Sequence, residues 1–158
     1  KRNFVSKLIL NDGSVVTGEK QIGEAMVDYF KQIFASTMPS NFDQILQGID
    51  TKVTPAMNAD LTREFTADEV EFALKQMKPL TAPGPDGMSP IFYKSCWNFI
   101  GHVVIDASLA ILNSGNMPTS LNHTYISLIP KIKSPEKATD FRPISLYNVL
   151  YKIVSKKP

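Results

Sequence analysis

Cysteine is almost absent from this sequence of 158 residues, which holds one, Cys96. A single cysteine excludes an internal disulfide and a multi-cysteine zinc site, and it fits a reducing compartment. Long apolar runs are also absent: none approaches the roughly 20 residues that cross a bilayer, and the first residues lack the apolar stretch of a secretory signal. We therefore expect an intracellular protein, in the nucleus or the cytoplasm, that is not secreted and has no membrane partner.

The short motifs of several enzyme classes are missing as well. The sequence has no HExxH, no GxxxxGK[ST] phosphate loop and no GxSxG turn. His102 and His123 have no carboxylate or cysteine at ligand spacing, which favours surface or loop positions. Cys96 stands beside Trp97 in an apolar helical pattern, which favours a buried, unreactive thiol. We expect neither a catalytic residue nor a metal site in this chain.

What is present is the composition of a globular protein with an uneven charge. Apolar residues make up 43%, charged residues 20%, and the net charge is +2. Residues 39–78 sum to −3, whereas residues 115–158 sum to +5. A local excess of this size fits a polyanion such as nucleic acid, although on charge alone a solvated lysine surface is the simpler explanation.

Apolar spacing predicts a helix-rich α+β fold. Residues 8–17 predict a short hairpin, because extended segments flank the turn sequence Asn-Asp-Gly-Ser. A helix is predicted from Glu19. Its apolar stripe is Ile22, Ala25, Met26, Tyr29, Phe30 and Ile33. Residues 36–59 are weakly periodic and predict a loop with one short helix around residues 42–47 and a break at Pro55.

The second half gives sharper local signals. Thr66 and Glu69 form a capping box for a helix that Pro79 closes. Ser89 and Pro90 begin another helix. That helix is predicted to continue through Phe99, and helical spacing resumes over residues 102–113, with Gly115 at its end. The remaining segments predict strands over residues 124–129 and 141–146 and a helix over residues 148–156.

Nine of the 11 prolines lie from Pro79 onward, and several of them frame a turn. The turn consists of Ala82, Pro83, Gly84, Pro85, Asp86 and Gly87. This segment cannot be helix or central strand, because proline lacks an amide donor and glycine permits positive φ. The sequence leaves open whether the turn is ordered or mobile.

Lys131 and Arg142 are the most suggestive cations. If the two C-terminal strands pair in antiparallel fashion, Lys131 ends the first strand and Arg142 begins the second, so both lie at the same end. Two converging cations are unfavourable unless an anion lies between them. Arginine supplies a bidentate fork for phosphate and lysine a point charge. This favours a phosphate or triphosphate site, with two solvated cations as the alternative.

Three segments in order resemble the reverse transcriptase of LINE-type, non-LTR retrotransposons, especially those abundant in plants. They are KQMKPLTAPGPDGMSPIFYKSCW, NHTYISLIPK and DFRPISLYNVLYKIVSK. The resemblance implies a partial reverse transcriptase domain over residues 66–158, with a template-contact segment and fingers. It further implies that residues 1–65 are similar to the linker between endonuclease and polymerase.

The resemblance also assigns roles to matching positions. It implies that the loop from Ala82 to Gly87 contacts template RNA, and that Lys131 and Arg142 bind the triphosphate of the incoming nucleotide. RNA template, DNA primer and dNTP are the implied partners of the complete enzyme. Two positions depart from the family pattern: Thr81 replaces the usual Lys, and Tyr147 replaces a common Cys.

The metal-binding aspartates of the family lie in two later motifs that these 158 residues do not contain. The complete family enzyme uses Mg²⁺, which those carboxylates hold. We therefore expect a fragment truncated before the palm and inactive alone. The sequence leaves open a non-enzymatic nucleic-acid-binding module, a protein-interaction scaffold that uses Phe92, Trp97 and Phe99, and an element without a cellular role.

Overall fold

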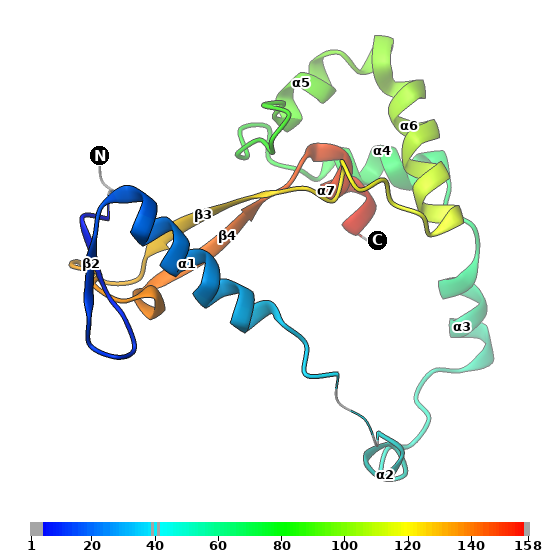
Figure 1. Ribbon diagram of the computed structural model, residues 1–158. Helices are drawn as coiled ribbons and strands as arrows, with labels where there is room; N and C mark the ends of the chain where they lie inside the picture. Colours follow the sequence, from blue (N-terminus) through cyan, green and yellow to red (C-terminus); the bar gives the residue numbers. More distant parts are fainter. Residues whose placement is uncertain (1–4, 39, 41, 157–158) are drawn as a thin grey trace. The chain divides into compact units, whose positions relative to one another are not determined.

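The protein combines helices with small two-stranded sheets, which confirms the α+β class (Figure 1). The structure, a computed structural model, describes residues 5–38, 40 and 42–156, without the side chain of Gln44. The chain forms two compact units: unit 1 is Lys1–Pro55 with Leu128–Ile144, and unit 2 is Ala56–Ser127 with Ser145–Pro158. The predicted division into residues 1–65 and 66–158 concerns the extent of a polymerase-like part and stays a prediction.

Unit 1 begins with the predicted hairpin. Strands β1 (Lys7–Ile9) and β2 (Val15–Thr17) pair in antiparallel fashion, with Leu8 opposite Val16. Helix α1 (Glu19–Phe34) follows and buries Ile22, Met26 and Phe30. The predicted stripe is therefore confirmed over most of its length, whereas its last member, Ile33, is 54% exposed.

A second hairpin contributes Leu128–Ile144 to unit 1, and the outer ends of its strands belong to unit 2. Strands β3 (Tyr125–Pro130) and β4 (Phe141–Leu146) pair with each other, and both lie within a residue of their predicted bounds. Their connection is too short for a parallel crossover, so the strands are antiparallel. It contains one turn of 3-10 helix, η1 (Ala138–Asp140). Phe141, 2% exposed, joins the core of unit 1.

Unit 2 is a helical cluster. Helices α4 (Ala67–Lys75), α5 (Pro90–Ser95), α6 (Trp97–Ser114) and α7 (Val149–Ser155) pack together, with α4 in contact with the other three. Their shared core consists of Val70, Ala73, Leu74, Tyr93, Val104, Val149 and Ile153. The predicted helical stripes of α4 and α7 supply most of it.

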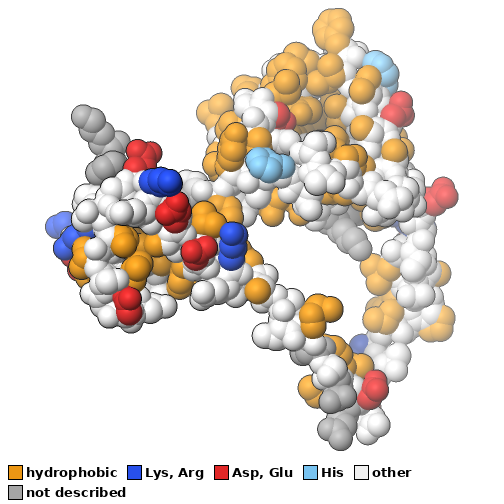
Figure 2. Space-filling view, viewed as in Figure 1, with side chains coloured by type: hydrophobic (Ala, Val, Ile, Leu, Met, Phe, Trp, Pro, Cys, Tyr) orange, Lys and Arg blue, Asp and Glu red, His pale blue; other side chains and the backbone are white. Residues whose placement is uncertain are grey.

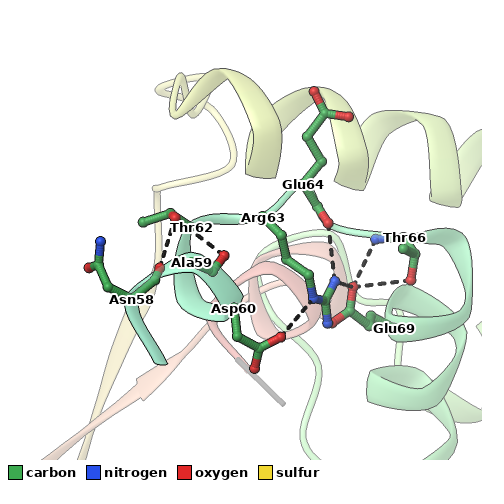
Figure 3. A network of polar contacts seen from close by, with 8 residues as sticks. All are labelled: Asn58, Ala59, Asp60, Thr62, Arg63, Glu64, Thr66 and Glu69. Atoms are coloured by element: carbon green, nitrogen blue, oxygen red, sulfur yellow. Dashed lines mark hydrogen bonds and ion pairs between the residues drawn. The ribbon is translucent and has the colours of Figure 1, made fainter. Parts of the chain in front are cut away.

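The predicted cap of α4 forms and takes part in a larger polar network (Figure 3). Glu69 Oε2 accepts a hydrogen bond from the Thr66 N–H at 2.8 Å. The Arg63 guanidinium donates to both oxygens of Glu69, at 2.6 and 3.1 Å, and its Nε donates to Asp60 Oδ1 at 3.3 Å. Arg63 and the Thr66 N–H together lower the pKa of Glu69 from 4.5 to about 2.

Two local predictions are wrong. Pro55 does not break a segment but begins helix α3 (Pro55–Thr62), because proline fits the first turn, where its missing N–H is not needed. No described residue of α3 is buried, so no apolar spacing reveals it. The second error is the continuous helix through Phe99, since α5 and α6 are separated at Cys96. The shorter predicted helix lies where α2 (Asp43–Leu46) forms.

The surface of unit 2 exposes several large apolar side chains. Figure 2 shows such side chains gathered on one face over α5 and α6. Among those of α5 and α6, Phe99 is the most exposed, at 80%. In the part of the chain that the structure describes, no helix has both the length and the apolar character to span a membrane.

Candidate nucleic-acid interface

The loop from Ala82 to Gly87 is an ordered turn. The Gly87 N–H donates to the Gly84 carbonyl at 3.0 Å, and Gly87 has φ +71°, which glycine adopts without strain. The Met88 N–H donates to Asp86 Oδ1, also at 3.0 Å. The structure therefore decides between the two possibilities that the sequence left open.

This loop packs on the start of helix α7, a relationship that we call the loop–α7 contact. A Cβ at Gly84 would lie less than 3.0 Å from Asn148 N, from Asn148 Oδ1 and from the carbonyl carbon of Tyr147. A methyl group does not fit at these distances. Two of the three contacted atoms belong to the backbone. The φ of Gly84 lies outside the left-handed region, so the backbone conformation does not require glycine there. Close packing against residues 147 and 148 does.

Two hydrogen bonds complete the loop–α7 contact. The Asp86 N–H donates to Asn148 Oδ1 at 3.3 Å, and Lys152 Nζ donates to the Ala82 carbonyl at 2.8 Å. Asn148 is 8% exposed, so its amide oxygen needs such a partner. Burial lowers the pKa of Lys152, and the charge of Asp86 opposes that shift.

Asp86 influences one further group beneath the loop. Burial raises the pKa of the Tyr93 hydroxyl, and the neighbouring Asp86 carboxylate raises it further. Tyr93 belongs to the core of unit 2 and packs edge-on against Phe92 at 5.5 Å between ring centroids. The Asp86 carboxylate of the loop thus acts on a hydroxyl group of the unit 2 core.

Sequence reasoning missed the residues that hold the loop. Asn148 precedes a helical stripe, a position that favours an N-cap, but nothing in the pattern connects it with a turn some 60 positions earlier. The sequence indicates Lys152 only as one of the basic residues between positions 115 and 158. Of the six predicted loop residues, Gly84 and Asp86 lie against Asn148, and Ala82 bonds to Lys152.

The two predicted phosphate ligands lie at the closed end of the β3–β4 hairpin. The Lys131 N–H donates to the Asp140 carbonyl at 2.7 Å, which closes the connection, and Arg142 is the second residue of β4. Lys131 Nζ donates to the Thr139 carbonyl at 2.7 Å, and the Arg142 side chain is exposed. Their predicted convergence on an anion is not tested by these contacts.

Two acidic side chains of the β3–β4 connection have partners of their own. Asp140 accepts hydrogen bonds from the N–H groups of Lys137 and Glu136, which lower its pKa, and Lys131 adds a smaller effect. Glu136 forms an ion pair with Lys7 at 2.6 Å. Lys157, one of the seven basic residues of the C-terminal segment, lies outside the described residues.

The residues that the structure describes do not fit a Mg²⁺ site. Among the described residues, no group of three or more His, Cys, Asp or Glu could hold a metal ion. His102 and His123 are both exposed, and Cys96 is partly exposed rather than fully buried. We therefore assign no metal-dependent step to this chain.

Two known proteins align with nearly the whole chain. It is 25% identical over 157 residues, 98% of its length, to the transposon TX1 uncharacterized 149 kDa protein of Xenopus laevis. It is 28% identical over 146 residues, 91% of its length, to the retrovirus-related Pol polyprotein from type-2 retrotransposable element R2DM of Drosophila melanogaster. The chain spans 12% of the length of each. No protein-family model matches it. The two alignments confirm the resemblance to non-LTR retrotransposon proteins.

Proposed function

We propose that this chain is part of an RNA-directed DNA polymerase of a non-LTR retrotransposon, covering a template-contact segment and most of the fingers. In this proposal the loop from Ala82 to Gly87 contacts the RNA template. Lys131 and Arg142 bind the triphosphate of the incoming nucleotide. Two relatives from transposable elements, one of them a Pol polyprotein, support the proposal because they align with nearly the whole chain.

The observation that carries the proposal is the loop–α7 contact. It joins two of the three segments on which the family resemblance rests, the one around Gly84 and the one around Asn148, which are far apart in sequence. The packing of one motif thus depends on the other, because the missing side chain of Gly84 leaves the space that the backbone of Asn148 fills. A shared structural unit is what two motifs of one enzyme family are expected to form.

Part of the loop is exposed to solvent, while the loop–α7 contact buries another part. Gly84 is buried, whereas Pro83, Asp86 and Gly87 are exposed. A loop that is already ordered loses little conformational freedom when a strand binds it, so more of the interaction free energy appears as affinity. Prolines restrict the loop further by fixing φ.

Binding to single-stranded RNA tests the proposal. Anisotropy of a labelled RNA of mixed sequence is recorded over a salt series, and we expect weaker binding at higher salt because released counterions accompany phosphate contacts. The double variant Lys131→Ala/Arg142→Ala should lower the affinity and reduce the salt slope by about 2, or about 1 for each lost phosphate contact.

A matched control removes the same charge elsewhere. Lys20 and Lys31 are exposed cations of helix α1, outside both the β3–β4 hairpin and the template-contact segment, and the double variant Lys20→Ala/Lys31→Ala has the same net charge as the test variant. The proposal predicts a larger loss for the hairpin variant. Equal losses would assign the binding to overall charge, and unchanged binding would place Lys131 and Arg142 on a merely solvated surface.

DNA synthesis is a separate test of completeness. On a primed RNA template with Mg²⁺ and dNTPs, we expect no extension by the purified chain, because the described residues do not assemble a two-metal carboxylate site. Extension products that survive repeated purification would contradict this part of the proposal.

A further inference from the structure

Two tyrosines at the loop–α7 contact stack face to face. The rings of Tyr147 and Tyr151 have centroids 4.0 Å apart and planes inclined by 9°. Other ring pairs that include a tyrosine meet edge-on, among them Tyr29 with Phe30 and Phe92 with Tyr93, whose ring planes are inclined by 76° and 88°. A parallel pair turns its ring faces, rather than its edges, outward along the stack.

The pair is also held in place and partly open to solvent. The carbonyl carbon of Tyr147 belongs to the close packing around Gly84, and the next residue, Asn148, is buried. Tyr151 lies one turn further along α7. Both tyrosines are partly exposed. Their rings therefore offer aromatic surface that need not be ordered when a ligand binds.

The surroundings favour a nucleic acid over an apolar partner. Lys152 follows Tyr151, and residues 149–156 contain two lysines and no acidic residue. The charge of Asp86, which lies in the loop itself, acts on Lys152. Aromatic faces accept any unpaired base, because every base has a π face, and neighbouring cations supply the phosphate contacts.

We propose that Tyr147 and Tyr151 form a stacking platform for an unpaired nucleobase of single-stranded RNA beside the Ala82–Gly87 loop. This inference rests on the proposed function and adds a base contact to it. It predicts a preference for single strands, since the bases of a duplex are already stacked on one another.

Photocrosslinking tests the platform without altering it. A single-stranded RNA that contains 5-iodouracil is bound to the intact chain and irradiated, and the crosslinked residue is identified by mass spectrometry. We expect crosslinks at Tyr147 or Tyr151. Crosslinks found only elsewhere, for instance at Tyr125 or Phe99, would overturn the platform.

Substitution supplies the quantitative arm. Tyr147→Leu and Tyr151→Leu keep apolar volume but remove the stacking face, and each should weaken single-strand binding by about fivefold or more. Tyr147→Phe should bind as the wild type does. Phe99→Leu is the control, because Phe99 is a highly exposed aromatic residue on α6. Thermal melting identifies any variant that fails to fold.

The outcomes distinguish a failure of the stacking platform from a failure of the proposed function. Wild-type RNA binding that both leucine variants retain in full overturns the platform and leaves the proposed function standing. Failure of the wild type to bind RNA overturns both. A leucine variant that binds duplex RNA as the wild type does but has lost single-strand affinity supports the platform specifically.

Discussion

Lys152 Nζ donates a hydrogen bond to the carbonyl oxygen of Ala82 at 2.8 Å, across 70 positions of sequence. The ammonium group is partly removed from water, which lowers its pKa, so the bond compensates a desolvated charge. Lysine at this position therefore holds the loop against α7 through one of its three N–H donors. A basic residue counted as part of a charged segment has a structural role.

Replacing Lys152 tests this role. Lys152→Met keeps the apolar stem and removes the donor, and we expect a loss of about 1 kcal/mol in the free energy of unfolding. Amide exchange of the loop segment should rise more than that of α4. Lys75→Met is the control, because Lys75 forms an exposed ion pair with Glu71 and such pairs contribute little. Equal effects of both variants would remove Lys152 from its anchoring role.

Gly84 gives the sharpest packing prediction. Gly84→Ala places a methyl group against backbone atoms of residues 147 and 148, which cannot yield as a flexible side chain does. Overpacking of this kind destabilises by about 1–3 kcal/mol. Gly23→Ala is the control: Gly23 is helical with nothing within 4 Å of the added Cβ, and alanine should stabilise α1. Chemical unfolding measures both, and a neutral Gly84→Ala would refute the close packing.

Asn148 tests the polar half of the contact. Asn148→Ala removes the acceptor of the Asp86 N–H and leaves that group without its partner, at a cost of about 1–3 kcal/mol. Asn148→Asp keeps an acceptor oxygen and should retain most of the stability. Faster exchange of the Asp86 amide in Asn148→Ala alone is the expected signature. Equal exchange in both variants would show that the hydrogen bond does not hold the loop.

Acid unfolding tests the network around Arg63. The pKa of Glu69 is lowered from 4.5 to about 2, so the folded state binds this proton less tightly than the unfolded state does. The associated stability is present above about pH 4.5 and is lost as the pH falls toward 2. Glu69→Gln should reduce the pH dependence in this window. Asp12 and Asp140, whose pKa values are also lowered, remain in both proteins, so the difference isolates Glu69.

Local patterns predicted the elements whose sequences carry regular apolar spacing, β-branched runs or a capping box. Helix α7 and strands β3 and β4 form where apolar spacing and β-branched residues place them, and α4 begins at its capping box. Helix α3 escaped prediction because it buries nothing, so its sequence carries no periodicity to detect. The separation at Cys96 escaped it because the apolar spacing continues through the break.

The candidate site was predictable only in part. Proline and glycine identify the turn from Ala82 to Gly87, since both restrict or extend the allowed φ in ways that exclude regular structure. Its order was not predictable, because the order depends on Asn148 and Lys152, which lie 62 and 70 positions from their partners. Periodicity reports the neighbours along a helix or strand, not contacts of this range.

Mapping of bound RNA tests the central claim most directly, namely that this chain contacts nucleic acid through the loop from Ala82 to Gly87 and the β3–β4 hairpin. Amide chemical shifts are followed while single-stranded RNA is added to the intact chain. We predict the largest changes at residues 82–88 and around Lys131 and Arg142, with little change along α1. Changes confined to α1, or evenly spread over all exposed lysines, would contradict the account.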